Sequence, residues 1–159
     1  MSMRTTESID LDAPAETVFP HVSDLGAYPA WLPLVHTATP DLAHPGDQGP
    51  AWIVELRAQV GPFARSKRLR MVRVAHQPPH SAAFERVETD GRQHARWSLR
   101  VEADERSGER GRATRLTMHL AYDGALWTGG LLERVLDDQI RRGKAGLAAM
   151  LTTSAPPTR

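Results

Sequence analysis

The sequence predicts an α+β fold in which a curved antiparallel sheet of six to seven strands wraps around a long C-terminal helix. Several segments between residues 5 and 122 alternate apolar and polar side chains, which is typical of half-buried strands. From residue 127 the apolar spacing changes from two residues to 3.6, which indicates one amphipathic helix over residues 127–151. Near the N-terminus an Ala-Pro step leads into two short helices. A sheet and a helix of these lengths can enclose a space for a small molecule.

The first strand is predicted over residues 5–11, where Ile9 and Leu11 share one face. Pro14 follows closely, and proline is favoured in the first turn of a helix. We expect Asp12 to cap the free N–H groups of that helix, because a carboxylate accepts hydrogen bonds from the first turn.

The two short helices follow directly. The first covers residues 15–22 and is shortened or bent by Pro20, which lacks a backbone N–H. Asp24 is expected to cap the second helix, which runs to about Tyr28 and stops at Pro29.

The middle of the chain predicts a meander. Residues 39–49 are expected to form a loop, because they contain two prolines and two glycines. A second polar loop is expected over residues 104–111, and Asp90-Gly91 is a hairpin signal. Links of this length join antiparallel neighbours. The alternating segments predict strands over residues 51–60, 63–75, 81–88, 94–103 and 113–122.

The C-terminal helix has an apolar stripe and a charged face. Gly143 and Gly146 fall on the apolar side, where each costs about 1 kcal/mol relative to alanine. They allow either close backbone packing on the sheet or room for a ligand. Gln139 also projects toward this side, to bond a main-chain group or to anchor a ligand. The stripe contains Leu132, Val135, Leu136, Ile140, Leu147, Met150 and Leu151, and the predicted solvated face contains Arg134, Asp137, Asp138, Arg141 and Lys144.

The basic strand at residues 63–75 allows two orientations. If Leu69 and Met71 face inward, the even-numbered arginines, Arg70 among them, are solvated. If the even-numbered valines face inward instead, Arg70 reaches toward the interior and pairs with a carboxylate or phenolate.

Composition narrows the function classes. At 159 residues and 17.6 kDa, the chain predicts one domain over residues 1–152, with a flexible tail at residues 153–159. The absence of cysteine excludes thiolate chemistry and suits the cytoplasm. A net charge of +1 and the lack of an apolar run of about 20 residues predict no nucleic-acid partner and no membrane insertion. The seven histidines lack metal-ligand spacing, and no cofactor motif is present, so we expect neither a metal nor a cofactor. A homodimer is compatible with the sequence.

The N-terminal run resembles the START-like superfamily, also called SRPBCC or Bet v 1-like, and within it the polyketide cyclase/dehydrase and lipid-transport group. Later segments fit the same pattern: residues 113–122 (ATRLTMHLAY) are similar to the family's last strand and residues 127–151 to its long C-terminal helix. The matching N-terminal elements are the strand and Ala-Pro of residues 9–14, the Val-Phe helix of residues 16–19, the Asp, Tyr, Pro and Trp of residues 24–31, and Pro33.

This resemblance implies a helix-grip fold with a cavity between the sheet and the terminal helix. Family members bind lipids, sterols, quinones, hormones or polyketides. Some close aromatic polyketide rings, and others act through a protein partner. The family has no shared catalytic triad to transfer.

Three functions therefore remain open. The first is binding of an apolar or aromatic small molecule without chemistry, which is favoured because no acid/base or nucleophile–base pair can be assembled from the sequence. The second is a polyketide aromatase/cyclase, with Arg70, Tyr122 and Gln139 as weak catalytic candidates. The third is regulation of a protein partner through a surface around Trp31. The residues expected to line the cavity are Trp31, Trp52, Val54, Leu56, Trp97, Leu99, Val101, Leu116, Met118, Leu120, Leu136, Gln139, Ile140, Gly143 and Leu147.

Overall fold

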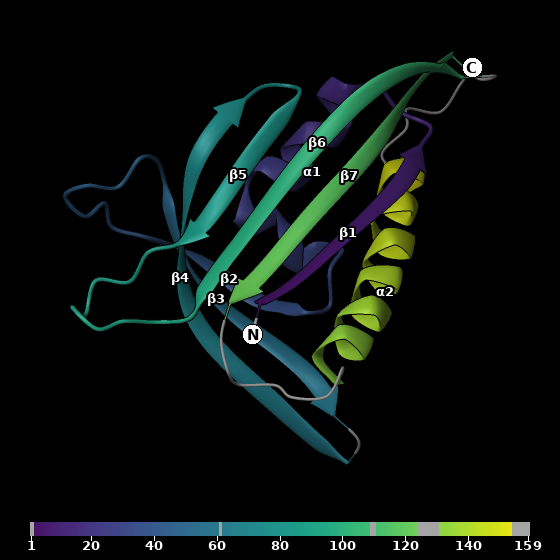
Figure 1. Cartoon of the computed structure of the whole chain (residues 1–159). Helices are drawn as coiled ribbons and strands as arrows, with labels where there is room; N and C mark the ends of the chain where they lie inside the picture. Colours follow the sequence, from purple (N-terminus) through teal and green to yellow (C-terminus); the bar gives the residue numbers. More distant parts are fainter. Residues whose placement is uncertain (1, 61, 109–110, 124–130, 154–159) are drawn as a thin grey trace.

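The computed structural model describes residues 2–60, 62–108, 111–123 and 131–153 (Figure 1). The predicted tail beyond Thr153 and the predicted helix start at residues 127–130 lie outside these residues. The elements in chain order are β1 (Ser2–Leu11), α1 (Ala15–Ser23), the 3₁₀ helix η1 (Leu25–Ala30), β2 (Val35–Asp41), β3 (Ala51–Val60), β4 (Phe63–Gln77), β5 (Ser81–Arg86), β6 (Arg96–Gly108), β7 (Gly111–Asp123) and α2 (Leu131–Thr153).

The strands form one curved antiparallel sheet, as predicted. Their order is β1-β7-β6-β5-β4-β3-β2, so each strand neighbours the next one along the chain, except that β1 pairs with β7. Figure 1 shows α2 running alongside β1, with α1 behind β6 and β7. The first strand and the last helix therefore meet at one side of the molecule.

The predicted loop at residues 39–49 begins too early, because β2 continues to Asp41. Pro40 within β2 pairs opposite Trp52 of β3. β2 is an edge strand, where proline removes no ladder bond on the open side, so the proline signal was misleading.

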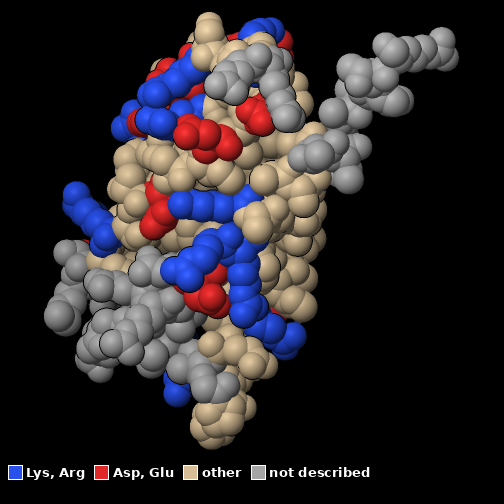
Figure 2. All heavy atoms as spheres, turned by 90° about the vertical axis from the view of Figure 1, so that its right-hand side faces the viewer, with Lys and Arg blue, Asp and Glu red and all other residues tan. Residues whose placement is uncertain are grey.

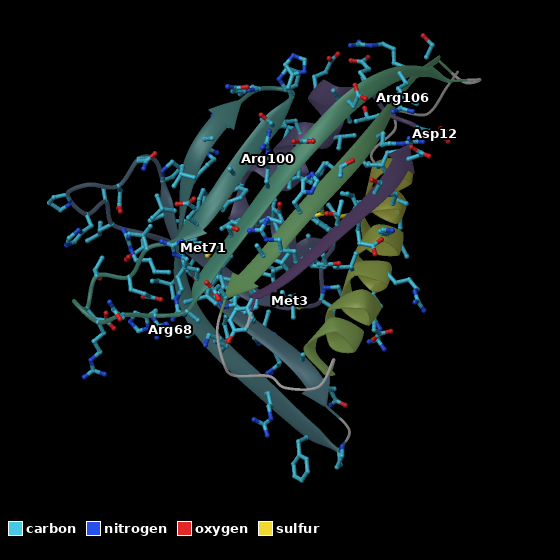
Figure 3. All side chains as sticks on the ribbon, in the orientation of Figure 1. Met3, Asp12, Arg68, Met71, Arg100 and Arg106 are labelled. Carbon is cyan, nitrogen blue, oxygen red and sulfur yellow. The ribbon has the colours of Figure 1, made fainter. Side chains whose placement is uncertain are left out.

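The predicted loop at residues 104–111 is also wrong. β6 runs to Gly108 and β7 starts at Gly111, and these two residues pair directly. The polar composition arises because this end of the hairpin is exposed, not because it is irregular. Arg112 of β7 is ion-paired with Glu105 of β6 and with Glu16 of α1. Arg106 lies on the same extended part of the hairpin (Figure 3).

Of the two predicted helix caps, one is confirmed and the other is wrong. Asp12 lies at the end of β1 (Figure 3) and does not cap α1, whose N-cap is Pro14 without a side-chain hydrogen bond. Asp24 does cap the second helix, because its Oδ1 accepts a hydrogen bond of 2.8 Å from the Gly26 N–H. That second helix is 3₁₀ rather than α and contains Pro29.

The core lies on the concave side of the sheet, under α1, η1 and α2. The inward face of α1 contributes Val18 and Val22, both fully buried. Tyr28 of η1 is fully buried as well, with its ring 6.4 Å from that of Phe84 on β5. The two short helices thus fill one end of the concave face, and the remaining space lies toward α2.

Candidate functional site

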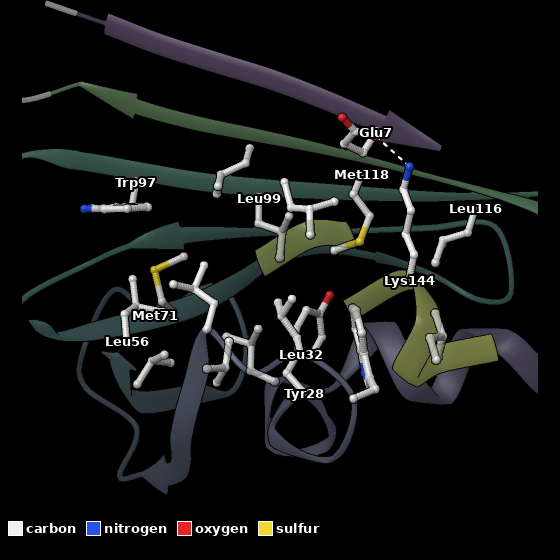
Figure 4. Close-up of a pocket in the computed structure, with 18 of the residues that line it drawn as sticks. Glu7, Tyr28, Leu32, Leu56, Met71, Trp97, Leu99, Leu116, Met118 and Lys144 are labelled. Atoms are coloured by element: carbon white, nitrogen blue, oxygen red, sulfur yellow. Dashed lines mark hydrogen bonds and ion pairs between the residues drawn. The ribbon is translucent and has the colours of Figure 1, made fainter. Parts of the chain in front are cut away.

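A cavity of about 100 Å³ lies between the sheet, the η1 segment and α2 (Figure 4). The sheet wall consists of Glu7, Ser8 and Ile9 of β1, Val35 of β2, Val54 and Leu56 of β3, Leu69 and Met71 of β4, Trp97 and Leu99 of β6, and Leu116, Met118 and Leu120 of β7. The opposite wall consists of Leu25, Tyr28, Trp31, Leu32, Leu34, Ile140, Lys144 and Leu147. The wall is almost wholly apolar.

The strands supply this wall because their side chains alternate. Val54 and Leu56 on β3, like Leu116, Met118 and Leu120 on β7, are two residues apart and so point to the same face. The antiparallel register places Leu99 directly opposite Leu120, which extends the apolar surface across neighbouring strands. A binary pattern of period two thus becomes a continuous apolar lining.

β4 adopts the orientation in which Leu69 and Met71 face the cavity. Arg68 is exposed, as that orientation predicts. Arg70 is not solvated, however: its side chain is only 2% exposed, on the face of the sheet away from the cavity. The prediction that Arg70 is solvated is wrong because the β2–β3 loop folds over it.

Arg70 binds two carboxylates and two carbonyls. Its Nε donates to Asp41 Oδ2 at 2.8 Å, and its two terminal nitrogens donate to Asp47 at 3.1 and 2.6 Å. Further bonds go to the carbonyl oxygens of Leu42 at 3.1 Å and Val87 at 3.2 Å. These bonds occupy all five guanidinium donors. Arg70 therefore fastens the β2–β3 loop to the sheet and does not reach the cavity.

The Arg70 contact also governs the titration of Asp47. Hydrogen bonds from the Arg70 guanidinium, and one from the His44 backbone N–H, lower the pKa of Asp47 from its ordinary 3.8 to about 2. A depressed pKa means that the ionised carboxylate contributes stability above pH about 4, and that this contribution is lost as the pH falls toward 2.

We expect an Asp47→Asn variant to lose less stability than the parent between pH 5 and pH 2. The physical reason is that an amide cannot take up the proton that weakens the contact to Arg70. Urea unfolding at a series of pH values measures this. Parallel curves for the parent and the variant over that range would contradict it.

The other two catalytic candidates do not line the cavity. Tyr122 is buried and its ring centroid lies 4.6 Å from that of Trp97. Gln139 is buried too, and its Oε1 accepts no hydrogen bond from the described part of the chain. The main-chain bond expected for that oxygen is therefore not seen. The Trp97 indole nitrogen also lacks a partner among the described residues, and it points away from Lys144 and Met118 (Figure 4).

The glycines of α2 serve close packing. A Cβ on Gly143 would lie 2.5 Å from Leu32 Cδ1, and one on Gly146 would lie 2.6 Å from the Trp31 carbonyl oxygen. The neighbour is the segment after η1 rather than the sheet, which corrects one detail of the packing interpretation. The alternative, that the glycines leave room for a ligand, is wrong because Trp31 and Leu32 fill that room.

The chain matches a family model described as "Polyketide cyclase / dehydrase and lipid transport" over residues 2–152. It belongs to this family. Because the match spans nearly the whole sequence, the sheet, the short helices and α2 all fall within it. The START-like resemblance inferred from the N-terminal run and the last helix is thereby confirmed. Among curated protein sequences, no relative matches.

Solved structures of other proteins share the fold of this chain, and one of them is a START superfamily protein. A START superfamily protein from Mycobacterium smegmatis aligns with a TM-score of 0.71 at 17% identity, covering 96% of this chain and 99% of the other. The Zhui aromatase/cyclase from Streptomyces sp. R1128 aligns with a TM-score of 0.64 at 15% identity, covering 96% and 94%. The di-domain ARO/CYC BexL of the BE-7585A biosynthetic pathway aligns with a TM-score of 0.62 at 18% identity, covering 98% of this chain and 51% of BexL. At these identities the similarity establishes the fold.

Most residues expected to line the cavity of this polyketide cyclase/dehydrase family member do lie at its wall. Trp52 does not, because η1 covers it and its ring packs 5.9 Å from Phe84. Val101 of β6 does not line the cavity either, and α1 contacts this strand. Gln139 and Gly143 are absent from the wall, and the side chain of Leu136 lies outside the described residues. Those at the wall are Trp31, Val54, Leu56, Trp97, Leu99, Leu116, Met118, Leu120, Ile140 and Leu147.

The charged residues of the wall, Glu7 and Lys144, are absent from the predicted cavity lining. Lys144 was assigned to the solvated face of the helix, yet it lies four residues after Ile140 and three before Leu147, both of which line the cavity. Glu7 lies two residues before Ile9 and so shares its face of β1. The spacing of both residues therefore predicts that they face the cavity. Their charge alone instead predicts that they face solvent.

Within the described ranges, no group of three histidine or acidic side chains could hold a metal ion. No described helix is both long and apolar enough to cross a membrane. Figure 2 shows basic and acidic side chains intermixed on the face that carries α2, rather than a patch of one sign.

Proposed function

We propose that this protein binds an apolar or aromatic small molecule in the cavity between the sheet and α2. The observation that carries this is the wall itself: apolar side chains from six strands, from η1 and the segment after it, and from α2 converge on a space that no side chain fills. Binding sites for small molecules are typically concave and apolar with few polar groups.

The volume of the cavity limits the size of the ligand that it can accept. About 100 Å³ is below the ~300–1,000 Å³ typical of drug-sized ligands. An apolar cavity of about 150 Å³ in another protein accommodates benzene. A single aromatic ring therefore suits the cavity as it stands, and a longer lipid, quinone or polyketide requires the walls to move apart.

Membership of the family supports an aromatase/cyclase activity, but the positions of the candidate polar side chains support it less well. Enolisation and loss of water need an acid or base that contacts the substrate. Arg70 lies on the other face of the sheet, and neither Tyr122 nor Gln139 lines the cavity. Binding without chemistry is therefore the function that the described residues favour.

Regulation of a protein partner through Trp31 has less support still. Trp31 is 4% exposed, and its indole N–H donates to the His21 carbonyl at 2.9 Å. Its ring packs against Tyr28 and α2, so it offers no surface to a partner.

Filling the cavity should abolish binding. We expect a Leu99→Trp variant to bind toluene, 1,4-naphthoquinone and decanoate at least ten times more weakly than the parent, because the larger ring occupies the guest's space. Arg100→Trp is the matched control: Arg100 is the next residue on β6, is exposed, and its surface pair with Glu102 contributes little stability. Titration calorimetry gives the affinities, and native mass spectrometry of freshly purified protein tests for a retained guest. Equal binding by the two variants, or no binding by the parent to any of the three probes and no retained species, would refute the proposal.

A further inference from the structure

An ion pair at the cavity wall joins β1 to α2. The Lys144 Nζ lies 2.6 Å from Glu7 Oε2, and both residues line the cavity. Their side chains are 31% and 34% exposed, so the pair lies where the cavity meets solvent. Figure 4 shows it at one end of the space, near Met118 and Leu116. A guest that enters there meets two opposite charges at the edge of an apolar chamber.

The other polar groups of the described wall are already engaged or turned away. The Tyr28 hydroxyl donates to the Val22 carbonyl at 2.8 Å, and burial raises the pKa of this phenol, so it remains neutral. Ser8 is exposed, and its Oγ lies 3.1 Å from Thr117 Oγ1. The indole nitrogen of Trp97 points away from the pair (Figure 4). A polar atom of a guest therefore meets Glu7 and Lys144.

The pair offers donors and acceptors together. An ammonium group has three N–H donors, of which Glu7 uses one, and the carboxylate retains free lone pairs. A hydroxyl both donates and accepts, so it can bond Lys144 and Glu7 at once without separating them. A carboxylate would be repelled by Glu7 and an amine by Lys144, and either would lose hydration on entering.

We propose that the guest carries a neutral hydroxyl, as an alcohol or phenol, which bridges Lys144 and Glu7 at the mouth while its apolar body fills the cavity. This rests on the proposed function and adds the chemical class of the ligand and its orientation. The apolar end enters first, and the hydroxyl stays at the edge.

A matched series of small rings tests the assignment. Toluene, 4-methylphenol and 4-methylbenzoate differ only in the polar group and are titrated at pH 7 into the parent, Lys144→Met and Glu7→Gln proteins by calorimetry. In the parent, 4-methylphenol should bind about tenfold tighter than toluene, equivalent to about 1.4 kcal/mol, and 4-methylbenzoate no tighter than toluene. Lys144→Met should reduce the phenol-to-toluene ratio to near one. Glu7→Gln should raise the affinity for 4-methylbenzoate at least tenfold, because Lys144 then faces no competing carboxylate.

Arg142→Met is the control variant. Arg142 lies on the same helix, is exposed, and pairs with Asp138 at 3.3 Å away from the cavity wall, so its phenol-to-toluene ratio should equal that of the parent. Equal binding of phenol and toluene by the parent, tightest binding of the benzoate, or the same ratio in the Lys144 and Arg142 variants would each overturn the hydroxyl assignment and leave the binding function standing. Failure of all three rings to bind the parent would overturn the hydroxyl assignment, and if 1,4-naphthoquinone and decanoate also fail to bind and no species is retained, the binding function falls as well. Ratios within one protein cancel any general loss of folded material.

Discussion

Replacing Arg70 by methionine should lower the free energy of unfolding by about 3 kcal/mol, the lower end of the range for removing one partner of a buried ion pair. The variant leaves the Asp47 side chain, only 4% exposed, without its bidentate partner, and the carbonyls of Leu42 and Val87 without a donor. The lower end applies because Asp41 is 35% exposed and regains water. Urea denaturation at pH 7 measures the change.

Arg68→Met is the natural comparison. Arg68 lies two residues earlier on the same strand, points to the same face and is exposed. Its substitution should change stability by no more than about 0.5 kcal/mol, as is usual for surface positions. If the two variants unfold at the same urea concentration, the loop does not depend on the Arg70 contacts, and the interpretation of that network fails.

Replacing Gly146 by alanine should destabilise the protein by up to about 2 kcal/mol, although alanine normally stabilises a helix interior by about 1 kcal/mol. The added methyl would lie 2.6 Å from the Trp31 carbonyl oxygen, a main-chain atom that cannot rotate aside. α2 must then shift from the segment after η1, and overpacking of this kind costs about 1–3 kcal/mol. Thermal and urea unfolding both report the change.

Gly143→Ala distinguishes the collision from the helix effect. There the nearest atom is Leu32 Cδ1, the far end of a side chain that can change rotamer. We expect this variant to be as stable as the parent or slightly more stable. If Gly146→Ala also stabilises the protein, α2 does not pack against Trp31 as closely as the structure shows.

The fold was predictable because its strongest signals are periodic. The period-two segments placed β1, β3, β4 and β7 within a few residues of their bounds, and the change to period 3.6 identified α2. The errors occurred where polar composition and irregular structure diverge. The exposed arm of the β6–β7 hairpin has no buried face to produce alternation, and β2 contains Pro40 at a sheet edge, where proline is tolerated.

The site was less predictable because a cavity depends on which inward residues remain uncovered. Trp52 has the right parity, but η1 packs over it, and no pattern along one strand shows what a distant helix covers. Arg70 illustrates the converse. Its parity away from the cavity was one of two orientations considered, but its burial depends on Asp41 and Asp47, which lie 29 and 23 residues earlier in the chain.

The pairing of β1 with β7 and the contact of Glu7 with Lys144 bring together residues up to 137 positions apart. Chains with many such distant contacts fold slowly, since the intervening segment must be ordered before they form. The cavity lacks the wall formed by Ile140, Lys144 and Leu147 until α2 has been synthesised and has packed in place. A guest of the proposed binding function can therefore be retained only after α2 has packed against β1.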